Sequence, residues 1–253
     1  RDVLADAVAW TSRAVPARPP VPVLAGVRIT ADAEGTVRLA SFDYEVSARG
    51  EFPADVEEAG EVLVSGRLLR EIANALPHKP VQLTLDGTKV SVTCGASRFT
   101  LATMPVDQYP ALPELPEQSG TIDGATLQQA VAQVTSAASR DETLPILTGV
   151  RVEIEGSHIS LLATDRYRLA LRELEWKPSK SDISAVALLR AKTLSDTAKA
   201  LGAGDVTVAL SSGQGVDLVG FAAGGLVTTS LLMDGDYPQV RRLFPESSPI
   251  TAT

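Results

Sequence analysis

Apolar residues recur three and four positions apart in four stretches of the chain, namely 1–14, 65–76, 125–140 and 191–201. This spacing places them on one face of an amphipathic helix. In the second stretch the inward face is expected to hold Leu68, Leu69, Ile72, Ala73 and Leu76. Between the helices, apolar and polar residues alternate around glycine-containing turns, a pattern typical of antiparallel hairpins. The chain therefore predicts the order helix, strands, helix, strands, repeated once.

One eight-residue segment occurs twice. Residues 22–29 read PVLAGVRI, and residues 145–152 read PILTGVRV. The similarity extends upstream into the predicted helices, and each half ends on a Tyr-Pro pair. We infer two copies of one unit, separated by a segment rich in Pro, Glu, Gly and Ser. The predicted division is a first domain over 1–117, a second over 118–246, and the start of a linker over 247–253. A repeat of this kind can be purely structural, because symmetry alone names no ligand.

The composition argues against several kinds of chemistry. Cys94 is the only cysteine, and His78 and His158 are the only histidines. Such widely separated residues are poor material for a zinc site or for nucleophilic catalysis. Asp43 and Asp165 occupy equivalent positions in the two copies, which favours two turn-capping residues over one pair of catalytic acids. No apolar run is long enough for a membrane-spanning helix.

The charge is unevenly distributed along the chain. The formal net charge is −8, yet lysines and arginines outnumber acidic residues in the predicted helices. The strands and loops are consequently acidic. If the helices share one surface, that surface attracts phosphates while the rest repels them. The alternative is that these cations are ordinary solvent-exposed residues of helices.

Several segments, in order and along nearly the whole chain, resemble the bacterial sliding clamp family, the beta subunit of replicative DNA polymerase III. The segments are RPPVPVLAGVRI, FDYEVSARGEF, SRFTLATMPVDQYPALP, LPILTGVRVEI, LLATDRYRLALREL and DGDYPQVRRLFP. The sequences of these segments are most similar to those of clamps from high-GC Gram-positive bacteria. The family has three copies of the unit, whereas this chain has two and ends on ESSPITAT. We therefore expect a third domain, and a first strand before Arg1, to be missing from it.

The resemblance implies an α+β DNA clamp fold, in which tandem domains each pack two helices on antiparallel sheets. It implies a cytoplasmic homodimeric ring around duplex DNA that acts as a processivity factor. The expected partners are the alpha subunit of DNA polymerase III, the clamp loader and other proteins that carry a clamp-binding peptide. No cofactor, no metal and no catalytic residue are expected, so the chain would be an accessory subunit of a nucleotidyltransferase complex and not an enzyme.

The resemblance also implies a pocket for a short apolar peptide on the middle domain. The matching positions are Leu147, Thr164, Arg166, Tyr167, Arg168, Leu169, Pro238, Val240 and Leu243. A peptide needs an apolar slot for its anchor and a few polar groups to fix its position, and TDRYRL at 164–169 offers both. The simpler interpretation is a tight turn capped by Asp165, with Leu169 as a core residue.

For DNA, the positions that match the family's central hole are Arg18, Arg67 and Lys192, and the helix faces add Arg70, Arg140 and Lys199. Two other classes of function stay open at this point. One is an enzyme with an active site between the copies, which would need converging titratable groups. The other is a ligand- or protein-binding module with no role on DNA.

Overall fold

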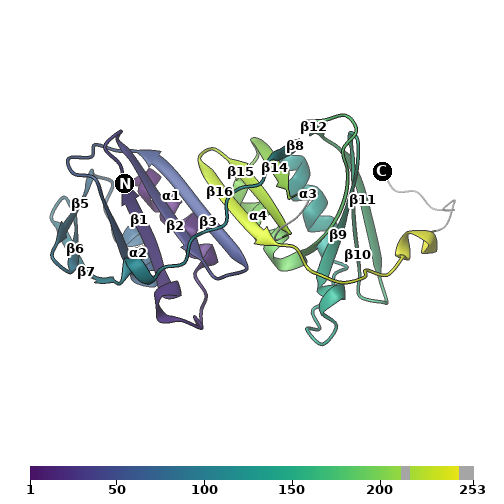
Figure 1. Cartoon of the computed structure of the whole chain (residues 1–253), viewed down its shortest axis with the longest axis horizontal. Coiled ribbons are helices and arrows are strands. Elements are labelled where there is room, and N and C mark those ends of the chain that lie inside the picture. The colour runs from purple at the N-terminus through teal and green to yellow at the C-terminus, as the bar shows by residue number, and fades with distance from the viewer. Residues whose placement is uncertain (212–216, 245–253) are drawn as a thin grey trace. The chain divides into compact units, whose positions relative to one another are not determined.

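The computed structural model describes residues 1–211 and 217–244 and divides into two compact units (Figure 1). The first unit comprises Arg1–Pro116 together with Gly220–Ser230. The second comprises the described residues of Glu117–Val219 and of the segment from Leu231 to Phe244. The repeat alone did not predict that Gly220–Ser230 packs with the first unit. The expected linker at 247–253 lies outside the described residues.

The first unit packs a pair of helices on antiparallel strands. The helices are α1 (Asp2–Thr11) and α2 (Gly66–Ala75), which contact each other. The strands are β1 (Gly26–Ala31), β2 (Thr36–Phe42), β3 (Val46–Pro53), β4 (Gly60–Ser65), β5 (Val81–Asp86), β6 (Lys89–Cys94), β7 (Ser97–Met104) and β16 (Leu226–Leu231). They lie in the order β16-β3-β2-β1-β4-β7-β6-β5. Short 3₁₀ helices cover Ser12–Ala14, Pro22–Ala25 and Val106–Gln108.

The second unit repeats this plan with α3 (Gly124–Thr135) and α4 (Ala191–Leu201), which also contact each other. One sheet has the order β11 (Leu169–Glu175), β10 (His158–Thr164), β9 (Gly149–Glu155) and β13 (Ser184–Arg190). Further strands are β8 (Gln118–Asp123), β12 (Lys177–Pro178) and β14 (Asp205–Leu210). Strand β15 (Leu218–Ala223) begins in this unit, and its residues from Gly220 onward belong to the first. The 3₁₀ helices of this half are Pro145–Thr148 and Val240–Leu243. All four predicted helices are therefore present.

The glycine of the repeated segment lies where the packing leaves no room for a side chain. In both copies a 3₁₀ helix ends there and a strand begins, at Gly26 in β1 and at Gly149 in β9. A β-carbon on Gly26 would lie 2.5 Å from the Leu63 side chain, and one on Gly149 would lie 2.7 Å from Leu188. The neighbouring leucine thus occupies the space that a side chain would need, which explains why both copies carry glycine.

The apolar faces of the helices form the core of each unit. In the first unit, Leu4 and Val8 of α1 and Leu69 and Ile72 of α2 pack with buried strand residues. Leu68 does not join them and is largely exposed, contrary to the sequence prediction. At 3.6 residues per turn, Leu69, Ile72, Ala73 and Leu76 share one face of α2, and Leu68 falls beyond the edge of that face.

A buried polar contact joins β16 to β3 in the first unit. The two strands are antiparallel, and Ser47 lies opposite Thr229. Their hydroxyl oxygens are 2.6 Å apart, and the Thr228 hydroxyl donates to the Ser47 carbonyl at 2.6 Å. These buried hydroxyls therefore satisfy one another, as buried polar groups must.

Among the described helices, none is long and apolar enough to cross a membrane.

The start of α3 provides a test of the fold. Gly124 donates its N–H to the Gly204 carbonyl at 2.9 Å, and a β-carbon on Gly124 would lie 2.2 Å from the Gly202 carbonyl oxygen. Backbone atoms cannot give way as a side-chain end can. We expect Gly124→Ala to destabilise the second unit by about 1–3 kcal/mol or more, which is several degrees in thermal unfolding.

The matched control is Gly204→Ala, because a β-carbon there meets nothing within 4 Å. It should leave the melting temperature nearly unchanged. Equal melting temperatures for the two variants, followed by circular dichroism, would contradict the close packing described for Gly124.

Candidate functional site

An open cavity of about 590 Å³ lies within the second unit. Three chain segments form its walls: the 3₁₀ helix at 145–148 with the loop before it, the turn between β10 and β11, and the segment from 236 to 243. The lining residues are Thr143, Leu144, Pro145, Ile146, Leu147, Thr164, Arg166, Tyr167, Leu169, Asp236, Pro238, Val240 and Leu243. Most of these side chains are apolar, so the cavity is built to receive an apolar group.

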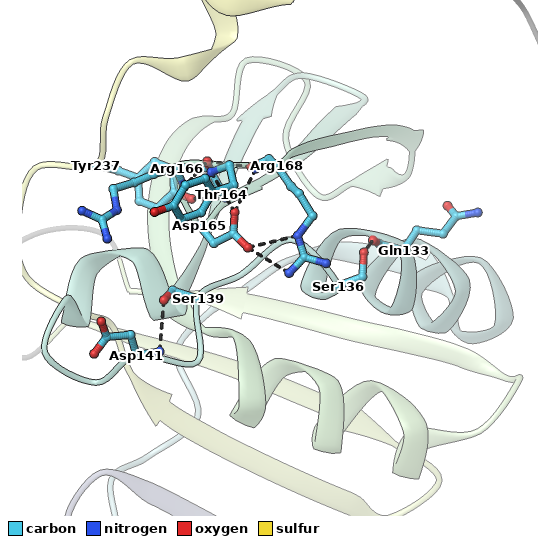
Figure 2. A network of polar contacts seen from close by, with 10 residues as sticks. Gln133, Ser136, Ser139, Asp141, Thr164, Asp165, Arg166, Arg168 and Tyr237 are labelled. Carbon is cyan, nitrogen blue, oxygen red and sulfur yellow. Dashed lines mark hydrogen bonds and ion pairs between the residues drawn. The ribbon is translucent and has the colours of Figure 1, made fainter.

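The turn between β10 and β11 is fixed by Asp165 (Figure 2). Its Oδ1 accepts hydrogen bonds from the backbone N–H groups of Tyr167 at 3.0 Å and Arg168 at 2.8 Å. Its Oδ2 accepts from the Arg168 guanidinium at 2.8 and 3.0 Å. Arg166 has a φ of 80°, a left-handed conformation that is uncommon for a residue with a side chain. The predicted capping role of Asp165 is confirmed.

Two further contacts hold Thr164 at the base of the cavity. The Thr164 N–H donates to the Tyr237 hydroxyl at 2.9 Å. The Thr164 hydroxyl donates to the Arg168 carbonyl at 2.7 Å and accepts from the Arg166 N–H at 3.1 Å. Burial raises the pKa of Tyr237, and the hydrogen bond from the Thr164 backbone partly opposes that rise. The first contact links the segment after residue 235 to the end of β10.

The loop that precedes the 3₁₀ helix is ordered by its own side chains. Asp141 Oδ1 accepts from the Thr143 N–H at 2.9 Å and from its hydroxyl at 2.6 Å. The Ser139 N–H donates to the Leu147 carbonyl at 2.8 Å. These bonds bring Leu147 and the residues before it to the cavity wall.

The rim of the cavity leaves large apolar side chains in water. Tyr167 is 87% exposed and Leu243 is 64% exposed, whereas Val240 is buried in the wall. Contiguous exposed apolar groups around a concave site are typical of an interaction site. Charged groups at the rim are Arg166 and Asp236.

A smaller hollow of about 280 Å³ adjoins Pro238 and Val240, and half of its lining residues are charged. Arg241 is central to it. Its guanidinium donates to Glu153 at 2.8 Å and also to Glu173, and Arg151 donates to Glu153 at 2.7 Å. The pairs attach the 240–243 segment to β9 and β11.

The structure brings eight of the nine predicted pocket residues to the cavity. Arg168 is the exception: its side chain turns from the cavity toward α3, where Ser136 and Gln133 lie (Figure 2). Its ion pair with Asp165 explains this direction. The sequence prediction missed Thr143, Leu144, Pro145, Ile146 and Asp236. The repeated segment was the available signal for Pro145 and Ile146, which directly precede Leu147.

The six cations predicted to contact DNA are all exposed. They are Arg18, Arg67, Arg70, Arg140, Lys192 and Lys199. Two of them make ion pairs one helical turn along. Arg67 in α2 pairs with Glu71 at 3.0 Å, and Lys192 in α4 pairs with Asp196 at 2.7 Å. These pairs stand at equivalent positions of the two repeats.

Other candidate chemistry is not supported by the geometry. Asp43 caps a turn of its own, accepting from the Val46 N–H at 2.6 Å. Cys94 is buried and donates weakly to the Pro77 carbonyl, as expected of an inert thiol. Within the described part of the chain, no three His, Cys, Asp or Glu residues gather in a way that could hold a metal ion.

The fold is a tandem α+β clamp, and its second unit carries an open, mainly apolar cavity. Two family models match the chain: the N-terminal domain of the DNA polymerase III beta subunit over residues 1–113, and its central domain over residues 121–239. The chain belongs to the DNA polymerase III beta subunit family. This membership confirms the resemblance, the fold class and the expectation of an accessory subunit, not an enzyme.

Named relatives agree with this assignment. The beta sliding clamp of Micrococcus luteus is 62% identical over the whole of this chain and 81% of its own length. The beta sliding clamp of Streptomyces coelicolor is 59% identical over 97% of this chain and 65% of its own length. The crystal structure of the DNA polymerase sliding clamp from Bacillus subtilis superposes with a TM-score of 0.88 at 29% identity, covering 98% of this chain and 67% of that one. The chain thus spans about two thirds of the length of several relatives.

The Asp165 turn predicts a specific titration. The hydrogen bonds from the Arg168 side chain, followed by those from the backbone, lower the pKa of Asp165 to about 2 from 3.8. Because the pKa of the folded state is depressed, the turn is fully stabilised above about pH 4 and loses this contribution as the pH falls toward 2. Carbon-13 NMR of the Asp165 carboxyl should show it still ionised at pH 3.

Asp165→Asn identifies the resonance, and Arg168→Ala should move the midpoint up toward the ordinary value because it removes the largest cause of the shift. A midpoint near 3.8 in the unmodified protein would show that the turn does not hold the carboxylate as described.

Proposed function

We propose that the chain is part of a ring-shaped sliding clamp that encircles duplex DNA and tethers the replicative polymerase to it, without making or breaking bonds. The observation that carries this proposal is the open apolar cavity of the second unit in a chain of the beta subunit family. The partners at the cavity are the alpha subunit of DNA polymerase III, the clamp loader and other proteins with a similar peptide. The ring is a cytoplasmic homodimer.

The composition of the cavity supports a short peptide as its occupant. Leu147, Leu169 and Val240 offer apolar surface to a leucine or phenylalanine side chain. Complete burial of such an anchor contributes about 1.5–3 kcal/mol. A peptide lying across the rim would also cover Tyr167 and Leu243, which are otherwise in water. Arg166 and Asp236 supply charges that can fix its register.

The distribution of cations supports duplex DNA as the second partner. Exposed lysines and arginines lie on or beside the helices, while the chain as a whole carries −8. Small polar residues such as Gln129 and Gln133 share the exposed surface of α3. Contacts of this kind reach phosphates and read no base sequence, so the duplex can move past them.

The peptide site is tested by Leu169→Glu. The new carboxylate would face an apolar cavity, and a bound peptide would have to bury it without a partner. We expect the affinity for a capped apolar pentapeptide ending in Leu-Phe to fall by at least about 100-fold, measured by calorimetry.

The matched control is Val186→Glu, which makes the same change at an exposed position of β13 that does not line the cavity. It should bind the peptide with unchanged affinity, and both variants should keep the circular dichroism spectrum of the parent. Equal affinity of Leu169→Glu and Val186→Glu would remove the cavity as the peptide site.

The ring is tested with the full-length protein on a nicked circular duplex. Topological enclosure predicts retention on the circle at a salt concentration that breaks phosphate contacts, and rapid loss once the circle is cut. Gel filtration of the DNA-bound fraction measures both. Equal retention on circular and linear DNA would contradict the clamp.

The cations are tested by the salt dependence of duplex affinity. Arg67→Ala and Lys192→Ala should each reduce the slope of log K against log salt by up to about 0.9, because each removes one phosphate contact. Lys89→Ala, which removes an exposed cation from strand β6, is the control and should leave the slope unchanged.

A further inference from the structure

The first unit contains a second copy of the turn that builds the cavity. The last pair of the β2–β3 hairpin is Phe42 opposite Ser47, and the last pair of the β10–β11 hairpin is Thr164 opposite Leu169. In both turns the next residue is an aspartate that accepts backbone hydrogen bonds. The residue after it is left-handed in both, with a φ of 74° at Tyr44 and 80° at Arg166. Phe42 is therefore the structural equivalent of Thr164.

The tyrosine that anchors the cavity is repeated as well. Tyr109, like Tyr237, is buried and precedes a proline. Burial raises the pKa of Tyr109 to about 12, and a hydrogen bond from the Phe42 backbone opposes the rise, as the Thr164 backbone does at Tyr237. Both units thus contain the same backbone arrangement: a hairpin turn that begins with an aspartate and a left-handed residue, and a buried tyrosine before a proline. We call this arrangement the frame of the site.

The two frames differ in what fills them. In the first unit Phe42 is buried in a cluster with Val23, Leu24, Leu63 and Tyr109. The Tyr44 ring packs edge-on against it, with ring centroids 5.6 Å apart. In the second unit Thr164 leaves this space to the cavity.

Two pairs of equivalent leucines near the two turns differ in how completely they are buried. Leu24 and Leu63 are each 0% exposed, whereas their equivalents Leu147 and Leu188 are 8% and 7% exposed. Leu24 and Leu63 pack in one cluster with Phe42, so the Phe42 side chain contributes to their complete burial.

We propose that the Phe42 side chain closes the first unit's copy of the cavity, so that the chain offers one peptide site although it contains two frames for one. The frame beneath Phe42 would take the same class of ligand, a short peptide with an apolar anchor. This inference rests on the proposed function only for the identity of the ligand, because closure itself is a property of the packing.

The test is Phe42→Thr in the full chain, which gives the first unit the residue of the second. Calorimetry with the capped pentapeptide ending in Leu-Phe should show two peptides per chain in place of one. Adding Leu169→Glu to Phe42→Thr should return the stoichiometry to one, with the remaining site in the first unit. Phe42→Met is the matched control, because it keeps a large apolar side chain at the same position, and it should leave one site.

A second measurement separates closure from peptide recognition. Xenon enters apolar cavities and shifts the methyl NMR signals of their walls. In the unmodified chain, xenon should shift Leu147, which lines the cavity, but not its equivalent Leu24. In Phe42→Thr it should shift both. The reciprocal variant Thr164→Phe should lose the shift at Leu147, and it decides the question even where Phe42→Thr does not fold.

The outcomes distinguish the proposed peptide function from the proposed closure by Phe42. If the unmodified chain binds no peptide but xenon reaches Leu24 in Phe42→Thr, the peptide function fails and closure by Phe42 stands. Closure is overturned if folded Phe42→Thr gains neither a second peptide nor a xenon shift at Leu24. It is equally overturned if Thr164→Phe keeps the xenon response of the parent.

Discussion

The hydrogen bond from the Thr164 N–H to the Tyr237 hydroxyl is the contact on which the site depends. It joins the end of β10 to a segment more than seventy residues later, and that segment supplies Pro238, Val240 and Leu243 to the cavity. Arg241 adds ion pairs to Glu153 and Glu173 from the far side of the same segment. A 3₁₀ helix of four residues has little stability of its own. Without these two attachments, the cavity would lose one of its three walls.

The same frame, held by a buried tyrosine, is filled in the first repeat and open in the second. In the first unit it completes a core, because an aromatic side chain at position 42 fills it. In the second unit a threonine at the equivalent position leaves it open, and the cost is apolar surface in water at Tyr167 and Leu243. A folded chain tolerates such a patch where a partner covers it. In the proposal made above, the side chain at this one position of a shared turn separates packing from recognition.

The sequence predicted the helices, hairpins and repeated segment well. It predicted poorly the directions of individual side chains and the pairing of distant strands. The helices and hairpins followed from periodicity, and the doubled PVLAGVRI segment located the glycine beneath Leu63 and Leu188. Leu68 failed because apolar character does not say which of two adjacent helical residues faces the sheet. Arg168 lies apart from the cavity because an ion pair with its neighbour Asp165, a property of the folded turn, redirects its side chain. The packing of Gly220–Ser230 with the first unit depends on strand pairing between distant segments, and no local pattern encodes it.

The electrostatics of the helices fit a contact that holds DNA weakly. Arg67 and Lys192 stand at equivalent positions, and each pairs with a carboxylate one turn along, Glu71 or Asp196. Exposed pairs of this type contribute little to folding stability. In the proposed contact with DNA, a phosphate would compete with the carboxylate for the cation, so each contact would contribute less than a free cation gives. A clamp that moves along DNA needs attraction without a fixed register, and cations already paired with acids on the same helix would meet that requirement.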